Sequence, residues 1–204
     1  MNPLAALRRY MAAEDPRVGV SNLIAMVLAW NTPFYPLYLL ASAGTAMQPG
    51  AWFTLAIFPV FLAVPAITRY WPLPGRVLLA SAGLSNTIWC TWLLGEASGT
   101  QLFLLPCIFL AAIIFRQGER MVLLGFLTLP IMLGLALHGR YPASPFACPA
   151  AACANIAWLN AFSVALLCGF LGRVTARMLE TADSPINSRA PAPASMPRRP
   201  PPAR

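Results

Sequence analysis

The chain has 204 residues, of which 58% are hydrophobic and only 10% are charged, and its formal net charge is +8. A soluble domain is typically about a quarter charged, so this composition excludes an ordinary soluble protein. The basic residues stand at the ends of apolar segments and form no stripe, which argues against nucleic acid as a partner. The chain contains no lysine but 21 prolines, which hints at a GC-rich bacterial genome.

Apolar residues concentrate in six segments, at 18–41, 51–68, 77–95, 101–115, 121–138 and 151–172. They predict an all-α fold, a bundle of six transmembrane helices. The arginines between them alternate: three, two, two and six fall on one side of the membrane and one, Arg140, on the other. The positive-inside rule then puts both termini in the cytoplasm. We therefore expect a multi-pass protein of the bacterial inner membrane, with the lipid bilayer as its surroundings.

Residues 1–17 form a cytoplasmic N-terminal segment in this reading. Leu4, Leu7 and Met11 are spaced as on one helix face, which predicts a short helix lying on the inner leaflet. The first apolar run follows two arginines and so resembles a signal peptide, but it is longer than the usual apolar region of roughly 7–15 residues. We interpret it as an uncleaved first membrane helix.

The outer end of that helix holds Pro33 and Pro36, which should kink or break it. Carbonyl groups freed at membrane depth must be covered by protein or water. Two interpretations stay open: an outward-facing pocket between the first and third helices, or a helix end with aromatic interface anchors. The candidate ligand-binding residues are Trp30, Asn31, Tyr35, Asn86 and Trp89. For Asn86, as for Asn155, hydrogen bonding between helices is the favoured alternative.

The last three segments carry further expectations. The fourth spans only about 21 Å at 1.5 Å per residue, short of a hydrocarbon core of roughly 30 Å, so the bilayer or its neighbours must compensate. The sixth helix should extend to about residue 181, which gives a membrane domain at 18–181. The proline-rich tail at 182–204 cannot bury a core and should be disordered.

Two cysteines, Cys148 and Cys153, flank the outer end of the sixth segment. The exterior face of a bacterial inner membrane is oxidising, so a disulfide between them is one outcome and two free thiols are the other. We predict the disulfide.

Catalytic and cofactor motifs are absent from the sequence. No segment core carries an ionisable residue, which argues against a pump or a proton-coupled carrier. His138 is the only histidine and cannot supply paired axial haem ligands, and no zinc-type ligand cluster exists. Phosphate-binding, dinucleotide-binding and GxSxG motifs are missing. We expect no catalytic residue, no metal, no cofactor and no enzyme activity.

The stretch from Gly95 to Arg120 reads GEASGTQLFLLPCIFLAAIIFRQGER. It resembles the six-helix N-terminal membrane region of bacterial class III adenylate cyclases, which is similar to regions of some histidine kinases and diguanylate cyclases. The residues that carry the resemblance are Gly99, Gln101, Phe103, Phe115, Glu119 and Arg120. It covers about residues 18–180 and implies a sensor region. No cyclase or kinase domain follows, so we expect a detached module, a truncated gene or an excised fragment.

We therefore expect a membrane sensor or regulatory module without its own catalysis. A signal would shift the helix packing, and the sixth helix would pass that shift to a cytoplasmic signalling enzyme. A homodimer is a further expectation. The alternatives are a small passive transporter or permease subunit and a membrane assembly factor.

Overall fold

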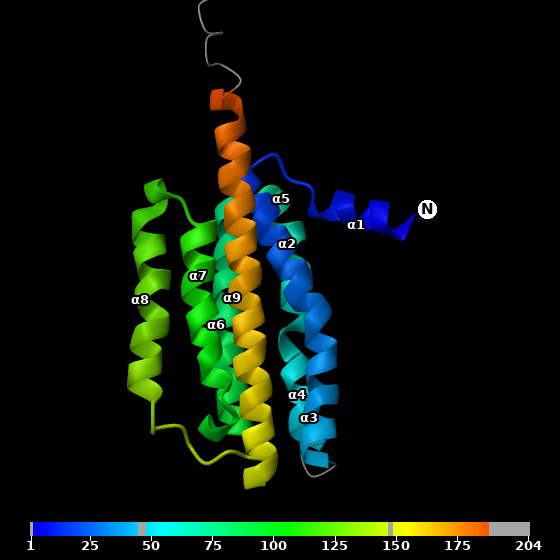
Figure 1. The fold of residues 1–204 in the computed structure, drawn as a ribbon, viewed down its shortest axis with the longest axis vertical. Helices are drawn as coiled ribbons and strands as arrows, with labels where there is room; N and C mark the ends of the chain where they lie inside the picture. The colour runs from blue at the N-terminus through cyan, green and yellow to red at the C-terminus, as the bar shows by residue number, and fades with distance from the viewer. Residues whose placement is uncertain (1, 45–47, 147–148, 188–204) are drawn as a thin grey trace, which may run out of the picture.

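The protein is described by a computed structural model over residues 2–44, 48–146 and 149–187, and this part of the chain is all-α, with no strand (Figure 1). The α-helices are α1 (Pro3–Met11), α2 (Pro16–Asn31), α3 (Tyr35–Ala43), α4 (Gln48–Phe53), α5 (Phe58–Tyr70), α6 (Pro72–Leu94), α7 (Leu104–Ile114), α8 (Arg120–Leu137) and α9 (Ala150–Asn187). The 3-10 turns are η1 (Thr32–Phe34), η3 (Thr54–Ile57), η4 (Glu96–Ser98), η5 (Thr100–Phe103) and η6 (Gln117–Glu119).

Within the residues that the structure describes, five helical stretches are long and apolar enough to cross a membrane. They are Pro16–Ala43, Pro49–Tyr70, Pro72–Leu94, Gln117–Leu137 and Ala150–Thr181. The remaining apolar stretch, Thr100–Ile114, is shorter and lies beside the others in the bundle (Figure 1). These stretches coincide with the six apolar segments of the sequence, and the chain is a multi-pass membrane protein.

The first stretch bends at its prolines and keeps running toward the same end of the bundle (Figure 1). Pro33 and Pro36 each stand in the first turn of their own helical piece, η1 and α3, a position that suits the fixed φ of proline. The Thr32 hydroxyl donates to the carbonyl oxygen of Leu28 at 2.8 Å. The disruption predicted from the sequence is therefore a 3-10 turn between two helices.

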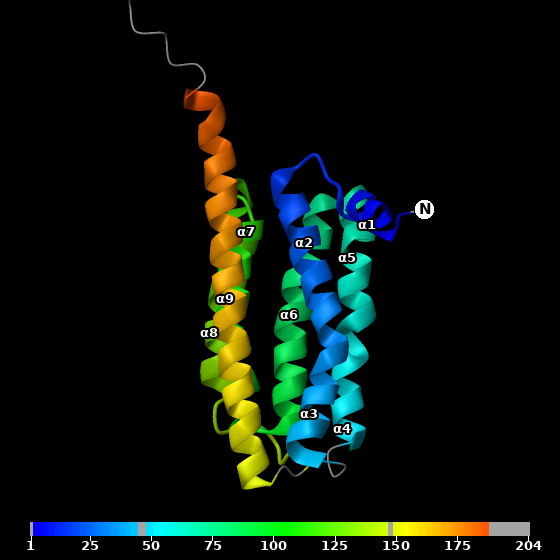
Figure 2. The same cartoon turned by 45° about the vertical axis from the view of Figure 1, so that its right-hand side comes forward.

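α1 lies across the bundle axis at the end where the chain begins (Figures 1 and 2). None of its residues is buried, and the Asn2 side chain caps its first turn by accepting from the Leu4 N–H at 3.0 Å. The Tyr10 hydroxyl donates to the Leu62 carbonyl oxygen at 2.6 Å and so attaches α1 to α5. A short helix is thus present in the predicted N-terminal segment, and its contact with a lipid leaflet stays a prediction.

α9 is the longest helix and passes beyond the rest of the bundle (Figures 1 and 2). It has 38 residues, about 57 Å at 1.5 Å per residue, which exceeds a hydrocarbon core of roughly 30 Å. It ends at Asn187, six residues after the boundary predicted at 181. A single proline, Pro185, falls in this extension, two residues before the helix ends.

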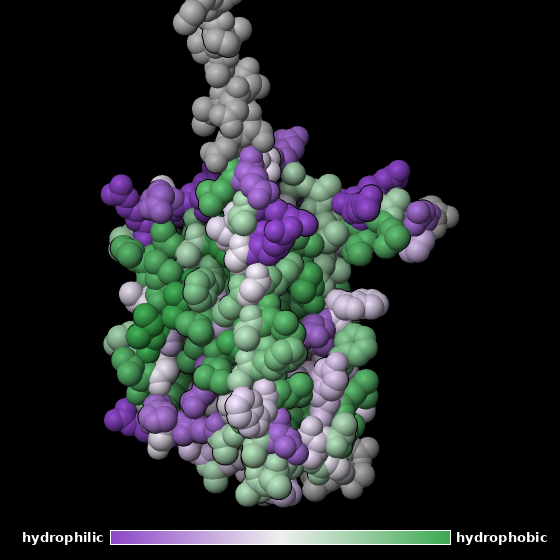
Figure 3. All heavy atoms as spheres, viewed as in Figure 1, coloured by the Kyte–Doolittle hydropathy of each residue, from purple (hydrophilic) through white to green (hydrophobic). Residues whose placement is uncertain are grey.

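Apolar side chains fill the bundle and also cover its outside. The main core cluster joins α2, α5, α6, α7, α8 and α9 through residues such as Ile24, Leu79, Phe115 and Leu171. α8 is peripheral, since only Leu123 and Pro130 of its residues are buried. Hydrophobic residues cover the middle of the face in Figure 3, and hydrophilic ones gather toward both ends. This distribution is the one expected of a bundle surrounded by lipid.

Candidate functional site

A cavity of about 130 Å³ lies inside the bundle, between α2, α5, α6, α7 and α9. Its walls are mostly apolar and include Phe61, Leu110 and Leu171. Among the residues described, no acidic or basic side chain and no histidine lines it. Ion binding would need such groups, so the cavity is suited to a small uncharged molecule.

Three of the five candidate ligand-binding residues line this cavity: Asn31, Tyr35 and Asn86. The other two do not. Trp30 is 76% exposed and packs against the ring of Phe34, and Trp89 is 39% exposed and donates its indole N–H to the Phe53 carbonyl oxygen at 3.2 Å. The two tryptophans therefore lie at the outside of the bundle, as interface anchors do.

Two side-chain amides, those of Asn31 and Asn86, give the cavity free hydrogen-bond donors. The Asn86 carbonyl oxygen accepts from the Cys90 thiol one turn later, at 3.6 Å. Its amide nitrogen donates to none of the described residues, nor does the Asn31 amide nitrogen. Within the described residues, Asn86 makes no hydrogen bond between two helices, which differs from the alternative that the sequence favoured. Both amides have donors that a ligand can use.

A buried hydroxyl and amide network closes the cavity at the end away from the N-terminus. Asn160 of α9 accepts from the Tyr35 hydroxyl at 3.1 Å and donates to the Ser98 carbonyl oxygen at 2.8 Å. Hydrogen bonds of 3.0 Å then join the Ser98, Thr100 and Thr91 hydroxyls. The network ties α3, η4, η5 and α6 to α9. Asn160 is fully buried, so these bonds replace any bond with water.

Gly99 lets the turn between η4 and η5 reach α9. Its φ of +70° lies in the left-handed region, and a Cβ there would lie 3.3 Å from the Cα of Ala157. Both facts favour glycine. Gly99 is one of the residues that carry the cyclase resemblance. Ser98, Thr100 and Thr91, in contrast, were not singled out by the sequence, because short hydroxyl side chains are common in membrane helices and only their partners make them a network.

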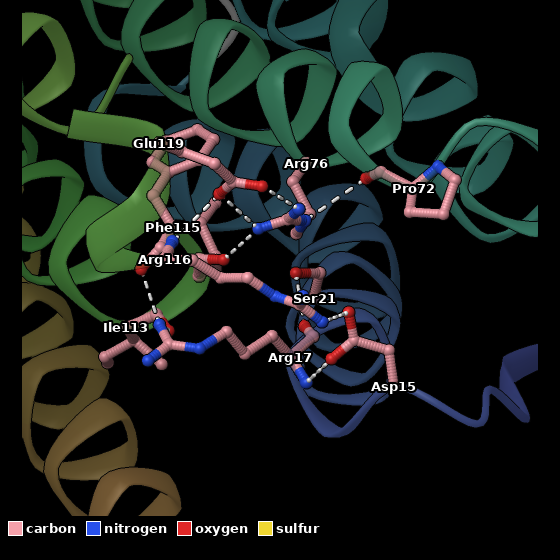
Figure 4. Close-up of polar contacts among 10 residues, drawn as sticks. Asp15, Arg17, Ser21, Pro72, Arg76, Ile113, Phe115, Arg116 and Glu119 are labelled. Atoms are coloured by element: carbon pink, nitrogen blue, oxygen red, sulfur yellow. Dashed lines mark hydrogen bonds and ion pairs between the residues drawn. The ribbon is translucent and has the colours of Figure 1, made fainter. Parts of the chain in front are cut away.

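Charged groups gather at the opposite end of the bundle, around the end of α7 (Figure 4). The Arg76 guanidinium donates to the two Glu119 carboxylate oxygens at 2.6 and 2.8 Å. It also donates to the carbonyl oxygens of Pro72 at 3.2 Å and Ile114 at 2.6 Å. The Arg76 side chain is only 3% exposed and that of Glu119 19%. Arg76 is therefore a buried cation whose hydrogen bonds reach three segments.

Two further arginines complete this end. Arg17 of α2 donates to the carbonyl oxygens of Ile113 and Phe115, and Arg116 pairs with Asp15 at 2.6 Å (Figure 4). Cations are favoured at the C-terminus of a helix, where the last carbonyls have no helical partner. α7 therefore ends within a layer of arginine side chains from α2 and α6. Neighbouring helices accommodate the short fourth segment in this way, as the sequence required.

The remaining site predictions concern cysteine and metal. Cys153 is buried near the start of α9, and Cys148 lies outside the described residues, so the disulfide stays a prediction. No group of three or more His, Cys, Asp or Glu residues is placed to hold a metal ion in the described ranges. Of the adjacent residues Glu119 and Arg120, the first is in the buried pair and the second is exposed.

Comparison with known proteins gives one family. Neither the curated proteins nor the solved structures contain a match to this chain. The sequence model of the MASE7 family matches residues 7–178, which include every helix that lines the cavity and the arginine layer. This match gives no separate support to the resemblance to class III adenylate cyclases, which stays a prediction. The chain belongs to the MASE7 family, a family of membrane-associated sensor domains.

Proposed function

We propose that this protein is a sensor module without its own catalysis, in which a small uncharged ligand in the cavity shifts α9 and α9 passes the shift to a cytoplasmic signalling enzyme. One observation carries the proposal: α9 runs from the cavity past the arginine-rich end and beyond the rest of the bundle (Figure 1). α9 contributes Asn160 to the buried network and Leu167 and Leu171 to the cavity wall, and then continues to Asn187. A change in the packing around the cavity would therefore shift α9 along its whole length.

The orientation that we propose has six membrane crossings and both termini in the cytoplasm. It is supported by the position of Arg17, Arg76 and Arg116, which come from three different connecting segments and meet at one end of the bundle. The alternating arginine count and the positive-inside rule assign that end to the cytoplasm. α7 then crosses the membrane as a short helix whose C-terminal carbonyl groups are covered by arginine side chains.

The cavity limits the ligand in size and chemistry. Its volume of about 130 Å³ is close to the roughly 150 Å³ of an apolar cavity known to take up benzene. The free amide donors of Asn31 and Asn86 would favour a molecule that carries one hydrogen-bond acceptor. Phenol meets both conditions and serves as a probe.

The experiment fuses residues 1–187 to a soluble reporter enzyme whose activity depends on the position of α9. The fusion is reconstituted in liposomes, and its activity is measured with and without phenol. We expect a change in activity that Asn86→Ala reduces severalfold, since the variant removes a free donor from the cavity wall. Asn155→Ala is the matched control, because Asn155 is exposed and does not line the cavity.

Equal responses in the two variants would contradict the proposal, because they would mean that phenol acts through the lipid. Faster movement of phenol-sized solutes across the membrane of liposomes that contain the protein than of protein-free liposomes, with unchanged reporter activity, would favour the passive transporter instead.

A further inference from the structure

A second hollow lies apart from the central cavity, at the arginine-rich end. It is an open groove of about 1080 Å³ between the start of α2, the η6 turn and the 170–181 stretch of α9. In Figure 2, α9 and α2 stand apart from each other at the upper end of the bundle. Four arginines line the groove, Arg17, Arg116, Arg173 and Arg177, against one acidic residue, Asp15. The groove therefore carries an excess of positive charge.

Two of these arginines have hydrogen-bond donors to spare. Arg17 and Arg116 are engaged with α7 and with Asp15. The guanidinium groups of Arg173 and Arg177, however, make no hydrogen bond or ion pair with the part of the chain that the structure describes, and both side chains are exposed. Residues four apart share one face of a helix. Arg173 and Arg177 thus present two cations together on the groove wall.

The deeper part of the groove is apolar. α2 enters the bundle after Arg17, so Val20 and Leu23 lie deeper than its arginine, and α9 runs the opposite way, so Phe170 lies deeper than Arg173. Val174 and Met178 of α9 add apolar surface at the level of its arginines. The groove is therefore cationic at its mouth and apolar below, along a direction that follows the bundle axis.

We propose that this groove binds one anionic phospholipid, with the phosphate on Arg173 and Arg177 and an acyl chain against the apolar wall. Guanidinium groups bind phosphate oxygens through paired, charge-assisted hydrogen bonds. Basic pockets between membrane helices are suited to acidic headgroups, and the position at the end of the apolar belt puts the arginines at headgroup depth. A bound lipid bridges α2 and α9 and holds α9 against the rest of the bundle.

The test uses the full chain, purified in dodecyl maltoside, with native mass spectrometry to measure lipid that stays bound. Dioleoyl phosphatidylglycerol and dioleoyl phosphatidylcholine are added in separate titrations, since they share acyl chains and differ in headgroup charge. The variant is Arg173→Gln with Arg177→Gln. The matched control is Arg69→Gln with Arg120→Gln, which removes the same charge from two exposed arginines outside the groove at the same end of the bundle.

We expect phosphatidylglycerol to bind more tightly than phosphatidylcholine. The double variant in the groove should weaken phosphatidylglycerol binding about thirtyfold, and the control should change it by less than about threefold. Circular dichroism checks that both variants keep their helicity. If the double variant does not fold, each single variant is measured, with a loss of about fivefold expected for each.

Three results would overturn the proposal. Equal binding of the two lipids would mean that the groove does not distinguish an anionic headgroup from a neutral one. An equal loss in the control would mean that the whole basic surface, not the groove, attracts the lipid. A thermal stabilisation by sodium phosphate as large as that by phosphatidylglycerol would identify free phosphate, not a lipid, as the ligand.

Discussion

Exchange of Glu119 for glutamine tests the buried ion pair that holds the arginine-rich end together. Glu119→Gln keeps the size of the side chain, and its amide oxygen can still accept from the Arg116 N–H, as the carboxylate does at 2.8 Å. What it removes is the negative charge beside Arg76. The Arg76 side chain is 3% exposed, so water cannot replace the lost partner.

The expected loss in the free energy of unfolding follows from how deeply Arg76 and Glu119 are buried. Removal of one partner of a buried pair typically costs about 3–5 kcal/mol, because a charge is left uncompensated. Glu119 itself is 19% exposed, and Arg76 keeps its carbonyl partners at Pro72 and Ile114, so we expect the lower end, about 3 kcal/mol. Arg116→Gln is the matched comparison. It breaks the pair with Asp15, in which the Arg116 side chain is 55% exposed, and should cost no more than about 1 kcal/mol.

The assay is reversible unfolding of the purified chain in mixed micelles with increasing SDS, followed by circular dichroism. The free energy of unfolding of each variant is compared with that of the original protein. A third variant replaces both partners, Arg76→Met with Glu119→Leu, and should lose less than Glu119→Gln alone, since it leaves no buried charge. If Glu119→Gln costs no more than Arg116→Gln, the pair is not a buried electrostatic contact and the reasoning is wrong.

Three further predictions concern topology, cysteine pairing and the buried network. Reporter fusions after positions 73, 118 and 185 should read cytoplasmic and those at 46, 98 and 144 exterior; one robust reversal excludes the six-crossing orientation. Mass spectrometry of the alkylated, non-reduced protein should find Cys148 and Cys153 linked, and alkylation of both thiols rules the disulfide out. Tyr35→Phe should lower the free energy of unfolding by about 0.6 kcal/mol through its lost bond to Asn160. Tyr38→Phe should leave the free energy of unfolding unchanged, because Tyr38 is 48% exposed and makes no side-chain hydrogen bond with the described residues. If both variants lose the same stability, the hydrogen bond between Tyr35 and Asn160 does not stabilise the fold.

The helices themselves were predictable from the sequence. Long apolar runs separated by arginine-bearing turns reflect the bilayer, a solvent that acts on each segment separately. The all-α fold, the segment positions and the shortness of the fourth segment all follow from that one-dimensional pattern. The end of the last helix was predicted too early. The prediction counted Pro185 as part of the proline-rich tail, but α9 includes it near its end.

The cavity and the contacts around it depend on the tertiary structure. Trp30 and Asn31 are neighbours in the chain and both are exposed, yet Asn31 borders the cavity and Trp30 does not, because one residue turns a helix by about 100°. Arg76 and Glu119 are 43 residues apart, and no pattern in the sequence pairs them. Hydrophobicity fixes which segments enter the membrane. The rotation and packing of the helices decide which of the few polar groups meet, since inside lipid each must find its partner within the protein.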